Sequence, residues 1–234
     1  GVDQRSASRH PDWTGPDDLT IKIGELRELT DWQKPIYVKF GATRVFHDVK
    51  LAVHAGADVI VIDGMQGGTG ATQWVFIEHV GIPTLAAVRQ AAQALDDMNM
   101  RGKVQLIVSG GIRTGADVAK ALALGADAVS IGQGVLIALG CNNSSYFQNA
   151  AHHSAVADYT ALGTAPGNCH HCHTGKCPVG VTTQDEILEQ RLQPAVGARH
   201  VKNYLRTLTM ELTTLARACG KQDVHHLEPE DLVA

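Results

Sequence analysis

Apolar and polar positions alternate in blocks along the first 140 residues of the chain. Four short runs rich in β-branched residues are typical of strands buried in a parallel sheet, and they cover Ile36–Phe40, Val59–Asp63, Gln105–Ser109 and Ala128–Gly132. A segment with helical periodicity follows each run, at about residues 43–54, 84–98, 115–124 and 135–139. Strands that alternate with helices in this way predict successive β/α units around a parallel sheet.

Further helices flank these units. Pro16, with acidic residues directly after it, predicts a helix that runs to about Leu29. A longer amphipathic helix is expected over residues 197–219, and Gly220 is placed to end it. Its expected apolar face consists of Val201, Leu205, Leu208, Leu212 and Leu215. Residues 142–168 are polar and rich in histidine and alanine, which indicates an insertion with a short helix.

The tripeptide Gly-Ala-Asp occurs at residues 56–58 and again at 125–127, each time between a helix and a strand. A barrel built of equivalent units would leave such a repeat. Four strands cannot close an eight-stranded barrel, so either the sheet is open or half of a barrel is missing. We favour the second interpretation: an α/β fold in which about four β/α units form the C-terminal part of a (β/α)8 TIM-type barrel, with the N-terminal half absent from this chain.

The expected organisation has three parts. Residues 1–140 form the partial barrel, and residues 141–182 hold the insertion and a cysteine-cluster loop. Residues 183–234 form a C-terminal helical segment that packs on the barrel.

Composition narrows the classes of function. The 234 residues are 44% hydrophobic and 19% charged, which is ordinary for a globular protein. A net charge of −4 argues against nucleic acid or an anionic membrane as a partner. No apolar run approaches the roughly 20 residues that span a bilayer, and no signal-peptide pattern opens the chain, so we expect a cytoplasmic protein. Gly1 stands where methionine would start a complete chain, which indicates a fragment or a processed protein.

Glycine-rich loops follow three of the predicted strands. They read Gly67-Gly68-Thr69-Gly70, Ser109-Gly110-Gly111 and Gly132-Gln133. Ligands bind at the carboxyl ends of parallel strands, and glycines before a helix N-terminus let backbone N–H groups approach a phosphate. The loops therefore predict a phosphate-bearing ligand, to which Arg113 would add a charge. The alternative is that each is only a flexible connection.

Lys39 lies near the carboxyl end of a strand otherwise built of tyrosine, valine and phenylalanine. A lysine there can project into the mouth of a barrel and stabilise negative charge on a ligand. A solvated lysine at a strand end is the alternative, and the neighbouring glycine loops favour the functional interpretation.

Three cysteines cluster within nine residues, at Cys169, Cys172 and Cys177. Thiolates so close in sequence can hold an iron–sulfur cluster, or zinc together with His170, His171 or His173. A redox-active Cys169–Cys172 pair is a third possibility. Cys141 is either a fourth ligand or a buried apolar residue, and Cys219 is expected in the core at a helix end.

Several of these motifs, taken in order, resemble the FMN-binding synthase domain of the glutamate synthase family. They are Gly67-Gly68-Thr69-Gly70-Ala71, Ser109-Gly110-Gly111 with Thr114-Gly115, and Cys172-x4-Cys177-Pro178-Val179-Gly180 with Thr183-Gln184. The tail, residues 216–232, is similar to stand-alone glutamate-synthase-like proteins. That subgroup includes the flavin subunit of N-methylglutamate synthase (methylamine–glutamate N-methyltransferase).

The resemblance implies an FMN barrel and an iron–sulfur relay, in an enzyme of glutamate biosynthesis that aminates and reduces 2-oxoglutarate through 2-iminoglutarate. Lys39 would be catalytic and contact the flavin or a substrate carboxylate. The cofactor-binding residues would be Lys39, Gly67, Gly68, Thr69, Gly70, Ser109, Gly110, Gly111, Gly132 and Gln133. The metal ligands would be Cys169, Cys172 and Cys177.

The chain departs from the family pattern at the cysteines. The family motif places five residues between its first two cysteines, whereas two separate Cys169 from Cys172. The family's first cysteine also directly follows the Ala-Leu-Gly that here precedes Cys141, and this chain then inserts about 27 residues. The first ligand is therefore Cys141 or Cys169, and the centre is 3Fe-4S or 4Fe-4S, with zinc as an alternative.

Three functions remain open. The first is an FMN- and iron–sulfur-dependent oxidoreductase subunit acting on CH–NH2 donors, with 2-oxoglutarate, glutamate or iminoglutarate as substrate. An amidotransferase or other ammonia-supplying subunit and an electron donor would be its partners, because the chain has no amidotransferase segment. The second makes N-methylglutamate from glutamate and methylamine. The third is a non-catalytic metal-binding assembly subunit.

Overall fold

A computed structural model describes residues 7, 9–68, 72–142 and 155–232. These residues divide into two compact units. The first, which we call the sheet unit, comprises 7–67, 74–131 and 209–234. The second, the cysteine unit, comprises 68–73 and 132–208 together with the first six positions of the chain.

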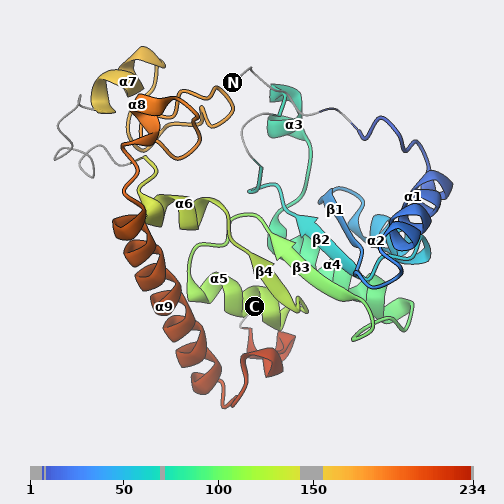
Figure 1. Ribbon diagram of the computed structural model, residues 1–234. Helices are drawn as coiled ribbons and strands as arrows, with labels where there is room; N and C mark the ends of the chain where they lie inside the picture. Colours follow the sequence, from blue (N-terminus) through green and yellow to red (C-terminus); the bar gives the residue numbers. More distant parts are fainter. Residues whose placement is uncertain (1–6, 8, 69–71, 143–154, 233–234) are drawn as a thin grey trace. The chain divides into compact units, whose positions relative to one another are not determined.

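The predicted β/α units are present (Figure 1). Their strands are β1 (Tyr37–Gly41), β2 (Val59–Asp63), β3 (Gln105–Ser109) and β4 (Ala128–Ser130), and their helices are α2 (Val45–His54), α4 (Thr84–Asp97), α5 (Gly115–Ala123) and α6 (Gln133–Leu139). All strand pairs are parallel, in the order β1-β2-β3-β4. The predicted parallel α/β arrangement is therefore confirmed.

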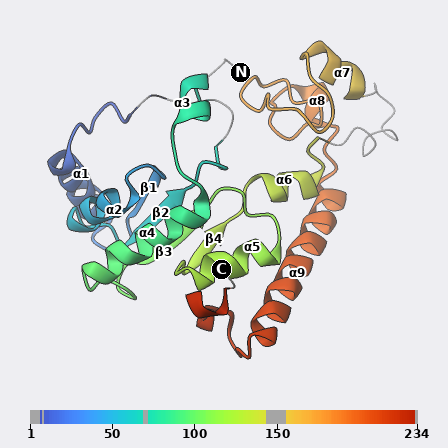
Figure 2. The same ribbon diagram turned by 180° about the vertical axis from the view of Figure 1, so that it is seen from behind.

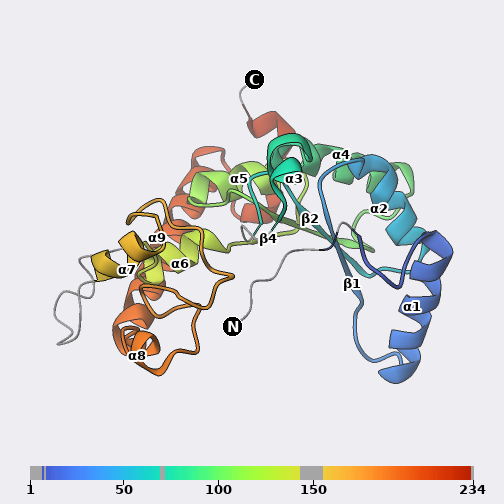
Figure 3. The same cartoon turned by 90° about the horizontal axis from the view of Figure 1, so that it is seen from above.

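Helices α2, α4 and α5 lie along one face of the sheet (Figure 3). Under them lie the fully buried side chains of Ile60, Ile62, Leu106 and Val108. Removing one such side chain from water stabilises the fold by about 1.5–3 kcal/mol. The alternate positions Lys39, Val61 and Ile107 share the opposite face and are less buried than the residues under the helices.

The Gly-Ala-Asp repeat makes the same contacts in both copies. Asp58 accepts a hydrogen bond from the Ile36 N–H at 2.7 Å, and Asp127 accepts one from the Leu106 N–H at 2.6 Å. Each carboxylate therefore ties the start of one strand to the start of the strand before it. The glycines have φ of +101° and +112°, and the carbonyl oxygen of each accepts a hydrogen bond from an arginine, Arg27 or Arg101, at 2.6 Å.

The remaining helices are α1 (Pro16–Leu29), α3 (Trp74–His79), α7 (Ala155–Ala161), α8 (Glu186–Glu189), α9 (Pro194–Ala218) and the 3-10 turns η1 (Val224–His226) and η2 (Pro229–Asp231). Helix α3 has no counterpart in the pattern, because six residues are too few to display a helical period. The two turns pack on α5 and are drawn in red in Figure 2.

Helix α9 corrects two expectations. Its buried apolar side chains are Leu208, Leu212 and Ala216, while Leu205 and Leu215 are 42% and 38% exposed. Cys219, expected in the core, is exposed. The predicted stop is present, since Gly220 has φ +74° and the Lys221 N–H donates to the Ala216 carbonyl at 2.8 Å.

Across the described part of the chain, every helix is too short or too polar to cross a bilayer.

Candidate functional site

Polar side chains from three strands meet at the carboxyl end of the sheet. Lys39 Nζ lies 3.2 Å from Asp63 Oδ2, and the Ser109 hydroxyl donates to Asp63 Oδ1 at 2.7 Å. The strand register explains why these side chains meet. Asp63 pairs with Ser109 of β3 on one side and with Gly41 of β1 on the other, and Lys39 lies two residues before Gly41. The Asp63 side chain is 20% exposed and the Lys39 side chain is 57% exposed. The lysine is therefore accessible to a ligand, although its ammonium pairs with Asp63.

The glycine loops after β2 and β3 pack directly against each other. The Gly64 N–H donates to the Ser109 carbonyl at 2.9 Å. A Cβ on Gly64 would lie 1.9 Å from Thr84 Oγ1, and one on Gly110 would lie 3.0 Å from the Gly64 carbonyl oxygen. Gly110 also has φ +105°, which disfavours any side chain. These glycines are required by the close approach of the two loops.

Thr84 and Gln66, which sequence reasoning did not select, hold the loops together. The Thr84 N–H donates to Gln66 Oε1 at 3.0 Å, and the buried Thr84 hydroxyl lies 2.8 Å from both Gln66 Oε1 and the Gly110 carbonyl. One hydroxyl proton serves one of these acceptors at a time. The only sequence signal is a threonine that follows proline at a helix start.

The start of α5 is occupied by carboxylates of the chain itself. Asp117 Oδ2 accepts the N–H groups of Arg113 and Thr114 at 3.0 and 2.9 Å, and Glu211 accepts the Gly115 N–H at 2.8 Å. Burial raises the pKa of Asp117, but these N–H bonds outweigh it and leave the pKa below its ordinary value. In the part of the chain that the structure describes, the N–H groups of Gly110 and Gly111 donate to no other group.

The predicted cofactor residues are thus distributed over both units. Lys39, Gly67, Ser109, Gly110 and Gly111 come together in the sheet unit. Gly68, Gly132 and Gln133 belong to the cysteine unit, where Gly132 is the N-cap of α6. Apart from the glycine and its two neighbours in the chain, no described atom lies within 4 Å of the place where a Cβ on Gly68 or Gly132 would stand. Thr69 and Gly70 lie outside the described residues.

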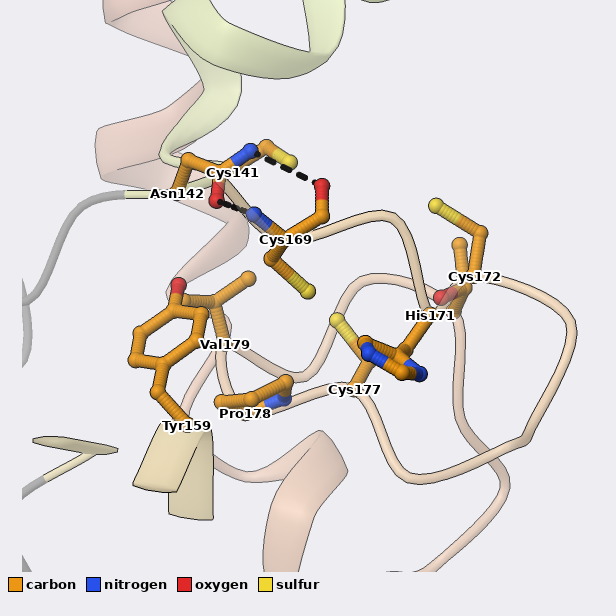
Figure 4. A pocket seen from close by; sticks show the side chains of 10 residues that line it. Cys141, Asn142, Tyr159, Cys169, His171, Cys172, Cys177, Pro178 and Val179 are labelled. Atoms are coloured by element: carbon orange, nitrogen blue, oxygen red, sulfur yellow. Dashed lines mark hydrogen bonds between the residues drawn. The ribbon is translucent and has the colours of Figure 1, made fainter. Parts of the chain in front are cut away.

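Four cysteines line one pocket in the cysteine unit (Figure 4). Cys141 stands at the end of α6, and Cys169, Cys172 and Cys177 come from the loop before α8. Cys177 packs in a small apolar cluster with Tyr159 and Val179, and Cys169 packs against that cluster. The structure therefore brings the three predicted ligands together and adds Cys141 to them.

The thiols interact electrostatically. Burial, reinforced by negative charge on Cys172, Cys177 and Cys169, raises the pKa of Cys141 to about 11. Burial and the neighbouring Cys177 and Cys169 likewise raise the pKa of Cys172. Several thiolates in one half-buried pocket therefore require a compensating positive charge, which metal ions supply. The donor set fits a soft-metal group.

Within the described ranges, no three His, Cys, Asp or Glu side chains converge closely enough to hold a single metal ion. His171 lines the cysteine pocket and stacks on His170 with ring centroids 4.6 Å apart. The zinc alternative would need one of these histidines to join three thiolates at one point.

The loop that carries Cys177 is held by contacts that sequence reasoning missed. Arg191 is buried, donates to the Pro178 carbonyl at 2.7 Å and pairs with Asp158 of α7. Gly180 has φ +76°, and a Cβ on it would lie 2.3 Å from the Leu188 carbonyl oxygen of α8. The glycine of the Cys-Pro-Val-Gly motif thus lets α8 pack against the cysteine loop.

Comparison with solved structures agrees with the fold. A flavocytochrome b2 variant with benzoylformate superposes with a TM-score of 0.55 at 20% identity, over 90% of this chain and 37% of that one. A mandelate oxidase variant with 2-hydroxy-phenylacetamide superposes with a TM-score of 0.52 at 19% identity, over 92% of this chain and 42% of that one. At these identities the likeness shows the fold, which is part of a (β/α) barrel.

Comparison with known sequences is more specific. A glutamate synthase large subunit-like protein of Rhizobium meliloti (strain 1021) is 61% identical over all 234 residues, which cover 51% of that protein. The archaeal glutamate synthase [NADPH] of Methanocaldococcus jannaschii is 38% identical over 97% of this chain and 40% of its own length. The chain thus spans about half the length of these relatives or less. The family described as the conserved region in glutamate synthase matches residues 1–149 and 150–222. The chain therefore belongs to the glutamate synthase family.

Proposed function

We propose that the protein containing this chain is a flavin- and iron–sulfur-dependent oxidoreductase that aminates and reduces 2-oxoglutarate to glutamate. The observation that carries the proposal is the contact chain Lys39–Asp63–Ser109 at the carboxyl end of a parallel sheet, in a member of the glutamate synthase family. Barrel enzymes bind their substrates and cofactors at that end of their strands.

FMN fits the free donors at this end. The N–H groups of Gly110 and Gly111, which donate to no other described group, would hold its phosphate. FMN, when bound, supplies hydride transfer. Asp63, anchored by Ser109, holds the Lys39 ammonium in place, and the lysine charge stabilises an anionic flavin or a substrate carboxylate.

The cysteine pocket would hold the electron relay. Cys169, Cys172 and Cys177 would bind the cluster as thiolates, and the cluster supplies one-electron transfer. Tyr159, Pro178 and Val179 line the pocket and are themselves buried. A subunit that supplies ammonia and an electron donor are the partners that this function requires.

A second candidate replaces ammonia with methylamine and yields N-methylglutamate. It rests on the similarity of residues 216–232 to the stand-alone glutamate-synthase-like proteins. Both candidates use the same sheet end and the same cysteine pocket.

The test uses the full-length protein, purified without oxygen. Its absorption spectrum should contain flavin bands, and with a chemical reductant it should convert 2-oxoglutarate and ammonium to glutamate, detected by chromatography. Faster turnover with glutamate and methylamine would favour the second candidate. A folded protein without flavin and without either product would contradict both, and would leave the non-catalytic metal-binding subunit.

A further inference from the structure

A pocket of the sheet unit lies beside β1, between that strand and the residues of α1 and α2 (Figure 1). Its volume is about 510 Å³, which is in the range of small-molecule sites. Lys39 is one of the lining residues, so the pocket adjoins the contact chain at the carboxyl end of the sheet. The rest of its lining has no role in the contacts described so far.

Cations predominate among the charged side chains that line this pocket. They are Arg9, Lys39 and Arg44, and the lining carboxylate is Asp48. Lys39 pairs with Asp63, and Arg44 Nη2 lies 3.1 Å from Asp48 Oδ1. Among the described residues, Arg9 forms no ion pair. The Arg44 side chain is 74% exposed, and its five N–H donors exceed what Asp48 accepts. The pocket therefore offers positive charge and free donors to an anion.

The remainder of the pocket wall is largely apolar. Trp13 also contributes an indole N–H that is buried and has no acceptor among the described residues, an unfavourable state for a donor. Cations combined with apolar walls fit a ligand whose carboxylates are joined by a hydrocarbon chain. The apolar residues are Leu19, Val38, Phe40, Leu51 and Ala52.

The backbone that carries Arg44 is fixed on both sides. The Ala42 N–H donates to the Asp63 carbonyl at 2.8 Å, and the Ala42 carbonyl accepts the Ile82 N–H at 2.9 Å. Arg44 follows as the N-cap of α2 and meets Asp48 one turn later. The guanidinium is thus presented from an anchored loop, as a binding residue requires.

The segment that precedes α1 is ordered by its own contacts. The His10 ring stacks on Trp13 with centroids 4.0 Å apart. Asp18 Oδ2 accepts the N–H groups of Thr14 and Gly15 at 2.8 and 3.1 Å. The wall opposite the loop after β1 is therefore also formed before a ligand binds, which lowers the entropic cost of binding.

This pocket is separate from the predicted phosphate site. Gly110 and Gly111 follow β3, and β1 is two strands away from β3 in the sheet. Neighbouring strands lie about 4.8 Å apart, so the two places are on the order of 10 Å apart. A phosphate held after β3 would leave the cations beside β1 available to a different anion.

We propose that the pocket selects a dicarboxylate substrate, and that Arg9 and Arg44 bind the carboxylate of 2-oxoglutarate that is remote from the reacting carbon. The inference rests on the proposed function, which supplies the substrate. Lys39 then pairs with the carboxylate beside the reacting carbon, so different cations hold the two ends of the molecule. Arginine binds a carboxylate through two parallel N–H bonds, which makes it the stronger determinant of specificity.

The experiment compares 2-oxoglutarate with 2-oxopentanoate, which has the same chain length but lacks the remote carboxylate. In the full-length protein, with ammonium and a chemical reductant, Arg44→Met should lower kcat/KM for 2-oxoglutarate on the order of 100-fold, because a charge-assisted contact is lost. The value for 2-oxopentanoate should stay unchanged. Arg9→Met should act in the same direction, and Arg44→Lys should recover part of the loss. Arg89→Met, at an exposed position of α4, is the matched control and should change neither value.

A binding measurement on the wild-type protein does not depend on the folding of any variant. By titration calorimetry, glutarate should bind on the order of tenfold more tightly than pentanoate. Equal affinities would overturn the proposal, and so would an Arg44→Met loss that is the same for both oxo acids or absent for both.

The two levels of the argument fail in different ways. Wild-type turnover of 2-oxoglutarate, with no change of preference in either arginine variant, would overturn the dicarboxylate pocket and leave the proposed function intact. A folded wild-type protein that converts no 2-oxoglutarate would overturn the proposed function, and the assignment of this substrate to the pocket with it.

Discussion

Asp63 connects two side chains that the sequence presents separately. It accepts the Ser109 hydroxyl and pairs with Lys39, so one carboxylate orients a cation at the end of the sheet. Thr84 connects two loops in a similar way, because its N–H and hydroxyl bind the Gln66 side chain and its hydroxyl also lies at the Gly110 carbonyl after β3. At this scale each contact joins residues that are 18 to 46 positions apart.

Because the Lys39 side chain is exposed at the end of the sheet, we expect its removal to lower catalytic activity. Lys39→Ala in the full-length protein should lower kcat/KM for 2-oxoglutarate on the order of 100-fold, since a positioned charge near the reacting atoms is lost. Lys39→Arg should recover part of the loss. Lys103→Ala, which removes an exposed lysine, is the control and should have no effect. Steady-state kinetics at equal flavin content provide the measurement, and an unchanged value for Lys39→Ala would contradict the assignment.

The close approach of the glycine loops predicts an effect on stability. Gly110→Ala should lower the free energy of unfolding by about 2 kcal/mol, because alanine is strained at φ +105° and its Cβ would press on Gly64. Gly24→Ala is the matched control. Gly24 lies inside α1 with nothing near a Cβ, so alanine should raise the stability by about 0.5–1 kcal/mol. Denaturant unfolding measures both, and equal effects would contradict the packing argument.

At the scale of elements, the β/α units repeat the same connection. In each copy of Gly-Ala-Asp, a glycine with positive φ ends the helical stretch and the aspartate caps the start of the neighbouring strand. The strands and helices themselves follow from local periodicity, so their bounds agree closely with the pattern. The exposures on α9 do not, because burial depends on what packs against the helix and not on its own period.

Asp58 predicts a pH dependence for one of these connections. Burial raises its pKa, but hydrogen bonds from Arg27 and Ile36 outweigh burial and lower the pKa below 3.8. The folded protein thus binds this proton less readily than the unfolded chain. The stabilisation is complete above the unfolded pKa of about 3.9 and is lost as pH falls through the lower folded value.

Asp58→Asn should therefore destabilise the protein at neutral pH by less than about 1 kcal/mol, since the aspartate is 41% exposed. The difference from the wild-type protein should shrink below about pH 4. Unfolding measured at several pH values tests this. Asp17→Asn, at an exposed position in the first turn of α1, is the control.

At the scale of the whole molecule, β1 is one of the two outer strands of the described sheet and pairs only with β2 there. Tyr37 on this strand is 57% exposed. Such an edge offers unpaired N–H and carbonyl groups to another chain. We expect the 234-residue chain, expressed alone, to associate with itself through this edge.

Size-exclusion chromatography tests the association. Tyr37→Lys should shift the chain toward monomer, because a charged residue on an edge strand opposes pairing. Ile21→Lys, at a helix position that is 63% exposed, is the control and should leave the association unchanged. A monodisperse, cooperatively unfolding wild-type chain would contradict the expectation.

The sequence alone determined the order and bounds of the β/α units, the family and the cysteine loop, because periodicity and motifs are local properties of a chain. Only the tertiary structure decided which residues meet. Strand register places Lys39, Asp63 and Ser109 together, α9 carries Glu211 to the start of α5, and Asn142 holds Cys141 against Cys169. These contacts depend on how distant segments pack, and no local pattern encodes the distance between two side chains that packing brings together.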